Sequence, residues 1–465
     1  MKKLAYIFIT FLIVSFSSRA QEKEVPPKGS EPKGFTLPEK EVVTLDNGLN
    51  LVMVPYGAIP KATITIMVKA GNIHEKEDET WLPDLLADLM KEGSTSMDAE
   101  EIANRMAGMG GDLNVSVGPH NTNLNSSVLY EFAPDAIGIM ADVLMNPSFP
   151  ESELERLKND MKRNINLQLS RPQSQARKDF FAKIYPDHPY GNLFSTEEIV
   201  DGFTVDAIKK FYDENYGAKR TTVYVAGKFD RKSVEKAVRD AFAAWREGPE
   251  DNYPTAKAVA SGDLAIIDRA GAPQSTIMYG LPVVDPSDKD YIPLMVTNSI
   301  LGGSFGSRIT SNIREDKGYT YSPRSRVETN YKSGVWYEFA DVTTAYTGAS
   351  LEEIKKEIVR LQNEPPSKEE LEGIQNYEAG VFVLRNSTPG GIIGQLSFLE
   401  IHDLPESDLQ NRVQRIYEVT PEMVQEMTQK YITPDHMTLV VVGDKKVIEK
   451  QIEDFQKQVK SPNVE

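Results

Sequence analysis

Residues 204–230 read TVDAIKKFYDENYGAKRTTVYVAGKFD, and residues 420–444 read TPEMVQEMTQKYITPDHMTLVVVGD. Each stretch predicts a helix that starts at a threonine, a turn with a tyrosine, an apolar strand, and then a glycine with an acidic residue. A second amphipathic helix follows each copy, at 234–242 and 447–455. The positions that match at the same interval are Thr204 with Thr420 and Gly227 with Gly443. The shared order of elements indicates an internal duplication.

The duplication predicts two domains joined by a linker. We place the N-terminal domain at 40–250, the linker at 251–261 and the C-terminal domain at 262–465, since residues around the linker are rich in Pro, Gly, Asp and Ala. Residues 21–39 are rich in Pro, Lys and Glu and are expected to be extended or disordered.

Strands and amphipathic helices are mixed within each half. In the first half, 42–55 and 62–71 predict a strand pair, and helices are predicted at 80–92, 98–108 and 151–169. Asp98 with Glu101 forms a start signal for the second of these helices. The fold class that follows is α+β, with two duplicated halves that each pack helices on one face of a mainly antiparallel sheet.

Residues 1–20 predict a secretory signal peptide that is cleaved after Ala20. Two lysines precede an apolar run at 4–16, which is shorter than the ~20 residues of a membrane anchor, the alternative interpretation. The chain has no cysteine, which excludes disulfides, thiolate metal sites and a lipid-modified cysteine. We expect an exported protein in the periplasm of a Gram-negative bacterium.

The formal net charge is −17 at pH 7. Such an acidic chain repels nucleic acid and anionic membranes and would attract basic peptides over long range. The alternative is that the charge only keeps the protein in solution.

The stretch 80–93 reads TWLPDLLADLMKEG and predicts one short helix. Its apolar residues recur at helical spacing and face a core. The start and end signals are Thr80 as the cap, Pro83 in the first turn and Gly93 at the end. The remaining, exposed face carries Asp84, Ala87 and Asp88.

The chain resembles the pitrilysin/insulinase family of zinc peptidases, which includes mitochondrial processing peptidase. The family carries His-x-x-Glu-His and a Gly-Ser or Gly-Thr step on the helix that matches 80–93. Further segments are similar to the family in order and spacing. They are Ala99–Ile102, Gly110–Asn114, Met145–Phe149, His188–Gly191, Ile300–Arg308 and Ile313–Tyr321.

The resemblance implies that the metal site is degenerate. Asp84, Ala87 and Asp88 stand where the family has its two histidines and its general base, and alanine cannot move a proton. The family's spacing to its third ligand leads to Arg163 and Asn164, neither of them a plausible zinc ligand. We expect no metal in this chain. Weak Ca²⁺ or Mg²⁺ binding by the two aspartates is the alternative to a solvated carboxylate pair.

The histidines give no replacement for the lost ligands. The chain has five of them, none at His-x-x-x-His spacing. His120 and His188 are interpreted as loop histidines rather than ligands.

The resemblance also implies a site that persists in the second half. Relatives bind substrate carbonyls beside the zinc with an Arg and a Tyr at the spacing of Arg314 and Tyr321, which here span a helix end, a glycine and the start of a strand. The alternative is that Arg314 pairs with a neighbouring acid while Tyr321 packs in the strand. The loop with Gly302 and Gly303 either touches substrate, as in the non-catalytic subunit of mitochondrial processing peptidase, or only forms a tight turn.

We therefore predict a non-catalytic, substrate-binding subunit of a heterodimeric periplasmic zinc endopeptidase that degrades peptides. The expected partners are a homologous subunit that carries the zinc, and unfolded peptides, but neither nucleic acid nor membrane. The chain would be inactive alone and hold no cofactor. The alternative is a homodimeric peptide-binding or scaffold protein without peptidase activity. An enzyme with another type of site is disfavoured, because the chain lacks Cys, has few His, and shows neither a Ser-His arrangement nor a phosphate loop.

Overall fold

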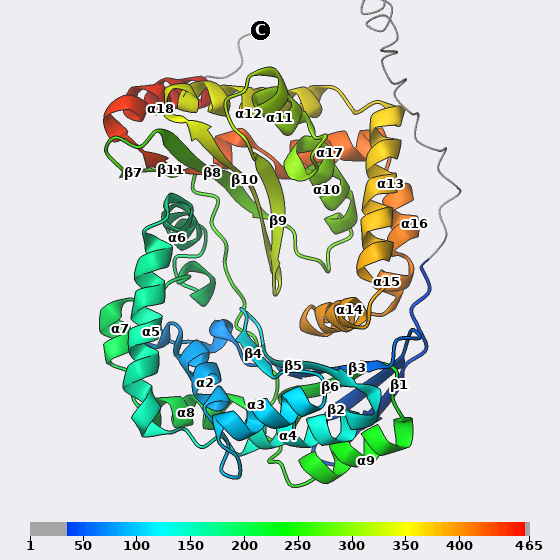
Figure 1. Cartoon of the computed structure of the whole chain (residues 1–465). Helices are drawn as coiled ribbons and strands as arrows, with labels where there is room; N and C mark the ends of the chain where they lie inside the picture. The colour runs from blue at the N-terminus through cyan, green and yellow to red at the C-terminus, as the bar shows by residue number, and fades with distance from the viewer. Residues whose placement is uncertain (1–34, 461–465) are drawn as a thin grey trace, which may run out of the picture. The chain divides into compact units, whose positions relative to one another are not determined.

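Two mixed sheets carry the fold, one from each half of the sequence (Figure 1). The computed structural model describes residues 35–460, so the predicted signal peptide lies outside the described residues. The first sheet has the strand order β1-β2-β6-β3-β5-β4. Its strands are β1 (Glu41–Thr44), β2 (Asn50–Pro55), β3 (Lys61–Val68), β4 (Asn114–Val117), β5 (Thr122–Leu129) and β6 (Thr221–Gly227).

The second sheet repeats five strands of the first. Its order is β7-β11-β8-β10-β9, which matches β2-β6-β3-β5-β4 strand for strand. In both sheets the first two of these strands are parallel and the rest are antiparallel. The strands are β7 (Leu264–Asp268), β8 (Gln274–Val283), β9 (Arg324–Asn330), β10 (Ser333–Thr343) and β11 (Thr438–Gly443). The predicted duplication and the α+β class are confirmed.

Helices fill the connections between the strands in both halves. Those before the linker are α2 (Leu82–Lys91), α3 (Ala99–Gly108), α4 (Ala133–Met145), α5 (Glu151–Leu169), α6 (Pro172–Ile184), α7 (Glu197–Asp201), α8 (Val205–Asn215) and α9 (Arg231–Phe242). Those after it are α10 (Tyr291–Asn298), α11 (Arg308–Thr310), α12 (Thr347–Asn363), α13 (Lys368–Arg385), α14 (Pro389–Ile401), α15 (Ser407–Gln410), α16 (Arg412–Tyr417), α17 (Pro421–Tyr431) and α18 (Lys445–Lys460). Between residues 35 and 460, no helix combines the length and apolar character that crossing a bilayer requires.

The repeated stretch folds in the same way in both copies. Thr204 caps α8 and Thr420 caps α17, each by accepting a hydrogen bond from the backbone amide three residues ahead. Both strands that follow are wholly buried. Gly227 ends β6 with φ 115°, where its Cα lies against the Lys61 carbonyl, so the turn requires a glycine there.

Each half also covers part of the other half's sheet with one helix. Phe180 and Phe181 of α6 pack on the face of the second sheet that carries Tyr337 and Val440. Figure 1 shows α6 beside this sheet and α14 beside the first one. The α14 residues that pack on the first sheet are Ile392, Ile393 and Leu396. The opposite faces carry the two large cores, so both faces of each sheet are apolar and covered.

Several local predictions were correct. Helices α3 and α5 lie at their predicted positions, and the Asp98 side chain accepts from the Glu101 amide at 2.8 Å. The apolar residues at helical spacing along α5 are buried: Leu154, Leu157, Met161 and Ile165. The boundaries 40–250, 251–261 and 262–465 stay predictions. The last residues before β1 are irregular, and Phe35 packs edge-on against Phe382 of α13.

The predicted strand pair of 42–55 with 62–71 was wrong. The first stretch is a hairpin, in which β1 pairs with β2 through a turn at Gly48. Strand β6 then lies between β2 and β3, parallel to one and antiparallel to the other. Strands that are neighbours in sequence are thus separated by one from much later in the chain, which local periodicity cannot reveal.

Candidate functional site

Helix α2 does not start as predicted. Its N-cap residue is Trp81, whose backbone is in the left-handed region at φ 73°, and Thr80 does not cap the helix. The Glu75 carboxyl accepts a hydrogen bond from the Trp81 amide at 2.8 Å, and the Trp81 indole donates to the Leu193 carbonyl at 3.1 Å. These two contacts hold a bulky residue in a conformation that such residues seldom adopt.

The face of α2 that was expected to be exposed is largely covered. Ala87 is 3% exposed, because α5 and α8 both pack against α2. Asp84 is partly buried and accepts a hydrogen bond from Asn72 Nδ2 at 2.8 Å. The same amide donates to Glu75 at 2.7 Å, so Asn72 joins two carboxyl groups. The expectation of a solvated pair is therefore wrong for Asp84.

Burial dominates the titration of these two carboxyl groups. It raises the pKa of Asp84 to about 6, against a smaller lowering by the hydrogen bond from Asn72. It also raises the pKa of Glu75 well above its usual value, and the nearby Asp84 adds to that. Glu75 Oε2 has no hydrogen-bond partner within the described part of the chain. Carboxyl groups with raised pKa values take up a proton more readily than the ionised carboxylates that bind a metal cation.

The residues at the degenerate site do not fit a catalytic zinc ion. Asp88 pairs with Lys91 at 2.7 Å, Arg163 pairs with Asp160, and Asn164 is exposed on α5. Zinc requires three converging nitrogen, sulfur or oxygen donors with an open position for water. Among residues 35–460, no three His, Cys, Asp or Glu side chains converge in a way that could hold a metal ion.

The second predicted site is formed by two π-helical segments of the second half and the chain that adjoins them. These are η6 (Ser299–Gly303) and η7 (Ser311–Asp316), with α11 and an exposed loop between them. We call residues 302–307 the glycine loop. Phe305 at its tip is 71% exposed, which is unusual for a phenylalanine. Two π-helical segments in succession are rare and often accompany functional sites.

Arg314 lies between two aromatic rings. Its guanidinium carbon is 4.5 Å from the centre of the Phe305 ring and 5.1 Å from that of Tyr321. Its Nε pairs with Glu315 at 3.1 Å, and no acceptor among the described residues holds its terminal nitrogens. The structure thus brings Arg314, Tyr321 and the glycine loop together. We name Phe305, Arg314 and Tyr321 the aromatic clamp.

Tyr321 was expected at the start of a strand, but it lies outside any strand. It lies in a bend before β9 and is 78% exposed, because only Thr320 bridges to β10. Its hydroxyl is thus available to a ligand. The part of the clamp that the sequence did not indicate is Phe305, since a phenylalanine in a glycine-rich stretch gives no signal that its ring stacks on Arg314.

A layer of polar residues supports the glycine loop. Asn298 Oδ1 accepts hydrogen bonds from Ser325 Oγ at 2.8 Å and from the Trp336 indole at 3.0 Å. Gly303 lies against the Asn298 side chain, and Gly302 lies against Ser325 and Glu338, so neither glycine has room for a Cβ. The glycines are therefore required by close packing, whether or not the loop touches a ligand.

Four of the five histidines gather around tyrosines although they are scattered in sequence. The His120 ring lies 5.9 Å from the His402 ring and 5.6 Å from Tyr190. The Tyr190 hydroxyl and the Tyr331 amide both approach His120 Nε2, at 2.7 and 3.1 Å, so this nitrogen accepts and the ring is neutral. Burial lowers its pKa to about 3. The other members are His74 and His188.

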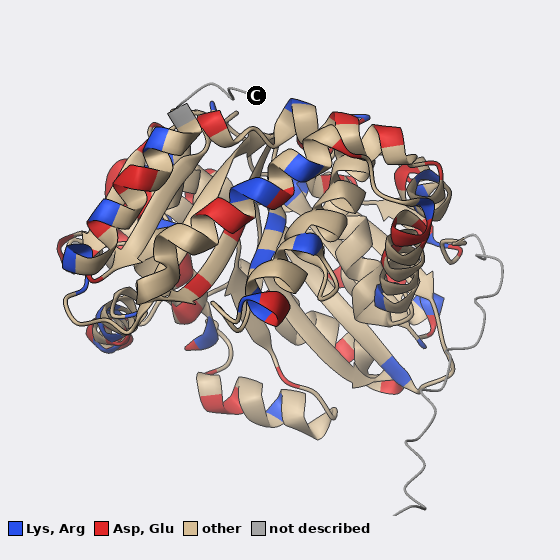
Figure 2. Ribbon diagram, turned by 90° about the horizontal axis from the view of Figure 1, so that it is seen from above, with Lys and Arg blue, Asp and Glu red and all other residues tan. Residues whose placement is uncertain are grey.

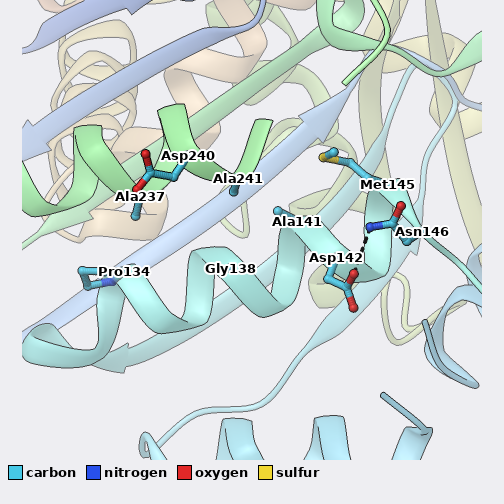
Figure 3. Close-up of a pocket in the computed structure, with 9 residues that line it drawn as sticks. All are labelled: Pro134, Gly138, Ala141, Asp142, Met145, Asn146, Ala237, Asp240 and Ala241. Atoms are coloured by element: carbon cyan, nitrogen blue, oxygen red, sulfur yellow. Dashed lines mark hydrogen bonds between the residues drawn. The ribbon is translucent and has the colours of Figure 1, made fainter. Parts of the chain in front are cut away.

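Two features outside these sites carry no chemistry of their own. A groove of about 400 Å³ runs between α4 and α9, and its walls are mostly small residues (Figure 3). Asp142 in this groove is already bound to Ser96 and Asn146. Figure 2 shows basic positions interleaved with acidic ones along the helices. Arg239 on α9, for example, pairs with Glu235 at 2.8 Å.

Two family models match the chain. Residues 53–196 match the insulinase family (peptidase family M16), and residues 202–377 match the peptidase M16 inactive domain. The chain belongs to the peptidase M16 family. The resemblance inferred from sequence motifs is confirmed, although this member lacks the metal-binding residues on α2.

Curated relatives and solved structures agree with this assignment. An "uncharacterized zinc protease" of Rickettsia felis is 25% identical, over 70% of this chain and 79% of that protein. One of Bacillus subtilis is 26% identical, over 73% and 83%. The fold is similar to that of a peptidase M16 inactive domain from Pseudomonas fluorescens, with TM-score 0.80, 22% identity, and 87% and 98% of the two chains covered. A protease from Helicobacter pylori has TM-score 0.82 and 19% identity, with 88% and 100% covered.

Proposed function

We propose that this M16 protein is the non-catalytic, substrate-binding subunit of a heterodimeric zinc endopeptidase that degrades peptides in the periplasm. The partner would be a homologous subunit that carries His-x-x-Glu-His and the zinc. This chain would supply Arg314 and Tyr321 to the partner's active site. The glycine loop would lie beside the bound peptide.

The observation that carries the proposal is the contrast between α2 and the aromatic clamp. On α2, Ala87 replaces the general base and is buried, and Asp84 is bound to Asn72. A chain with this helix cannot activate water through zinc. In the clamp, Tyr321 is 78% exposed and Arg314 is partly exposed, with Glu315 paired to its Nε, as the alternative interpretation expected, but with no acceptor among the described residues on its terminal nitrogens.

The chemistry of the clamp suits a peptide. The guanidinium and the Tyr321 hydroxyl can both donate to a carbonyl oxygen. The exposed rings of Phe305 and Tyr321 offer apolar surface for the neighbouring side chains of an extended chain. A donor that meets the developing oxyanion in the partner's site is worth about 3–4 kcal/mol.

Export to the periplasm is the remaining part of the proposal. It is supported by the signal-like residues 1–20 and by the lack of cysteine. The mature N-terminus of the secreted protein, read by Edman degradation, should be Gln21. An N-terminus at Met1 in a cytoplasmic fraction would remove the periplasm from the proposal.

The deciding experiment is reconstitution with an M16 homologue of the same genome that carries His-x-x-Glu-His. Each chain and the mixture are purified, and zinc content, mass in solution and cleavage of a fluorogenic peptide are measured. We expect zinc only in the partner, a one-to-one complex, and cleavage only by the mixture. Stoichiometric zinc in this chain alone, with chelator-sensitive cleavage, would overturn the proposal.

The same measurements test the alternative. The chain would instead be a peptide-binding protein if it formed a homodimer, bound peptides, formed no complex with any homologue and never cleaved a peptide.

A further inference from the structure

Glu338 is a fully buried carboxyl group without a partner. It lies in β10, is 0% exposed, and neither of its oxygens forms a hydrogen bond to the described residues. Its side chain is on the helix-covered face of the second sheet, the face of its neighbours Trp336 and Ala340. Burying a carboxylate in this way is very unfavourable, so the group is neutral in the folded protein.

The glycine loop lies directly on this carboxyl group. A Cβ at Gly302 would be 2.7 Å from Glu338 Oε2 and 2.6 Å from Ser325 Oγ. Ser325 gives its hydroxyl hydrogen to Asn298 and so donates nothing to Glu338. Ser304 in the loop is also buried with an unpartnered hydroxyl. Two buried polar groups are therefore unsatisfied, Glu338 beside Gly302 and Ser304 within the loop.

The charged groups around Glu338 do not compensate for its burial. Burial raises its pKa well above the ordinary value, and the nearby positive charge of Arg324 lowers it only in part. Glu378 accepts from Ser299, and Glu357 accepts from Asn312. Tyr279 of β8 lies opposite Glu338 in the sheet, and Ser325 of β9 lies opposite it on the other side, next to Arg324. Glu357 belongs to α12, which packs on β10.

We propose that Glu338 is a positioning residue of the peptide site: its neutral carboxyl supports the glycine loop in the closed position, and its ionisation favours lifting of the loop. The inference rests on the proposed function in taking the loop with Phe305 as part of that site. Water that enters when the loop lifts would solvate the carboxylate, which the closed loop cannot do.

The direction of the pH effect follows from the proton count. The closed loop keeps the proton on Glu338, whereas a hydrated carboxyl has an ordinary pKa of about 4.3 and loses it. The closed state therefore binds one more proton. Raising the pH above about 4.3 favours opening by up to tenfold per pH unit, until the pH passes the raised pKa of the closed state.

Hydrogen exchange of the loop amides measures this opening. The full chain, without peptide, is compared between pH 5 and pH 8 after correction for the intrinsic exchange rate. We expect the opening constant at residues 302–307 to rise by up to tenfold per pH unit. In Glu338→Gln it should not change with pH, because an amide does not ionise. The matched control Glu357→Gln alters a buried glutamate that is hydrogen bonded, and should keep the wild-type slope.

Equal slopes in the wild type and in Glu338→Gln would overturn the inference. If Glu338→Gln does not fold, the wild type alone decides: a loop slope no steeper than that of the α12 amides overturns it, and a steeper slope supports it. Peptide affinity is measured separately by fluorescence anisotropy. A failure to bind peptide would count against the proposed function and leave the exchange result as it is.

Discussion

The two halves share a strand order but differ in the segment that follows two equivalent strands. After β3 comes α2, a regular helix of 10 residues whose Asp84 is tied to Asn72. After the equivalent β8, the chain forms α10 and then two π-helical segments around the glycine loop. In the family, the first position holds the metal. Here it is a closed packing contact, and the irregular backbone and exposed aromatic rings lie in the second half.

The difference shows how equivalent positions in two copies of one fold can differ in packing. A polar helix face that no longer serves a ligand becomes covered, as Ala87 is by α5 and α8. The segment that would bind peptide in the proposed function has features with a cost, such as the exposed Phe305 and the unpartnered Glu338. The variants below test each side of this comparison.

The largest effect is expected at the two helices that cross between the halves. Phe180→Ala on α6 should lower the free energy of unfolding by about 3–5 kcal/mol, because the ring is 0% exposed against the second sheet. Leu396→Ala on α14 should cost about 2–4 kcal/mol, since it removes a smaller side chain from the first sheet. Urea unfolding followed by circular dichroism measures both. Leu167→Ala, 57% exposed on α5, is the control and should cost less than about 0.5 kcal/mol.

The second effect separates the two sites by activity. Arg314→Ala should reduce peptide turnover by the reconstituted complex by about 10²-fold or more, because it removes a donor to the substrate carbonyl. Asp88→Ala on α2 should leave turnover unchanged. Both variants should assemble with the partner as the wild type does, which gel filtration checks. Equal turnover in Arg314→Ala and wild type would remove the clamp from the active site.

The third effect is the pH dependence of α2. In the folded protein the pKa of Asp84 is raised to about 6 by burial, so between pH 4 and 6 the native state keeps a proton that the unfolded chain has lost. The Asp84 carboxyl therefore favours the native state at pH 4, and this contribution is lost as the pH rises through 6.

Replacing the Asp84 carboxyl by an amide tests the direction of this effect of pH on stability. From pH 4 to pH 7, Asp84→Asn should gain about 2 kcal/mol in the free energy of unfolding relative to the wild type. Asp88→Asn, which affects only a surface pair with Lys91, should follow the wild type. Parallel stability curves for Asp84→Asn and wild type from pH 4 to 7 would contradict the assigned burial.

The smallest effect is expected at the tip of the glycine loop. Phe305→Ala removes a ring 4.5 Å from the Arg314 guanidinium, a contact worth about 0.5–1 kcal/mol at an exposed site. Peptide affinity of the complex should fall about two- to fivefold, with turnover at saturation nearly unchanged. Phe305→Leu, which keeps apolar surface but not the ring's charge distribution, separates stacking from simple burial.

Local signals predicted the elements that are set by short-range chemistry. The helix starts at Thr204, Thr420 and Asp98 could be predicted from the sequence, because capping acts over three residues. The duplication was readable from order alone. The position of β6 between β2 and β3 was not, because strand pairing depends on residues far apart in sequence.

The candidate site was predicted in part. The sequence indicated Arg314, Tyr321 and the glycines, and the structure brings them together. It gave no sign of Phe305 over Arg314 or of Glu338 below the loop, since both depend on where a π-helical turn directs the chain. It gave no sign of the histidine cluster either, because His120 and His402 meet only through tertiary packing.

Helices α6 and α14 each pack on the sheet of the other half, and this has a consequence for how the chain folds. A nick in the irregular stretch 246–263 would leave each fragment with an apolar sheet face that only the other fragment covers. Neither fragment should be well behaved alone, and the two should remain associated after cleavage. The polypeptide thus completes its folding only after both halves have been synthesised, because each half needs the other to cover its sheet.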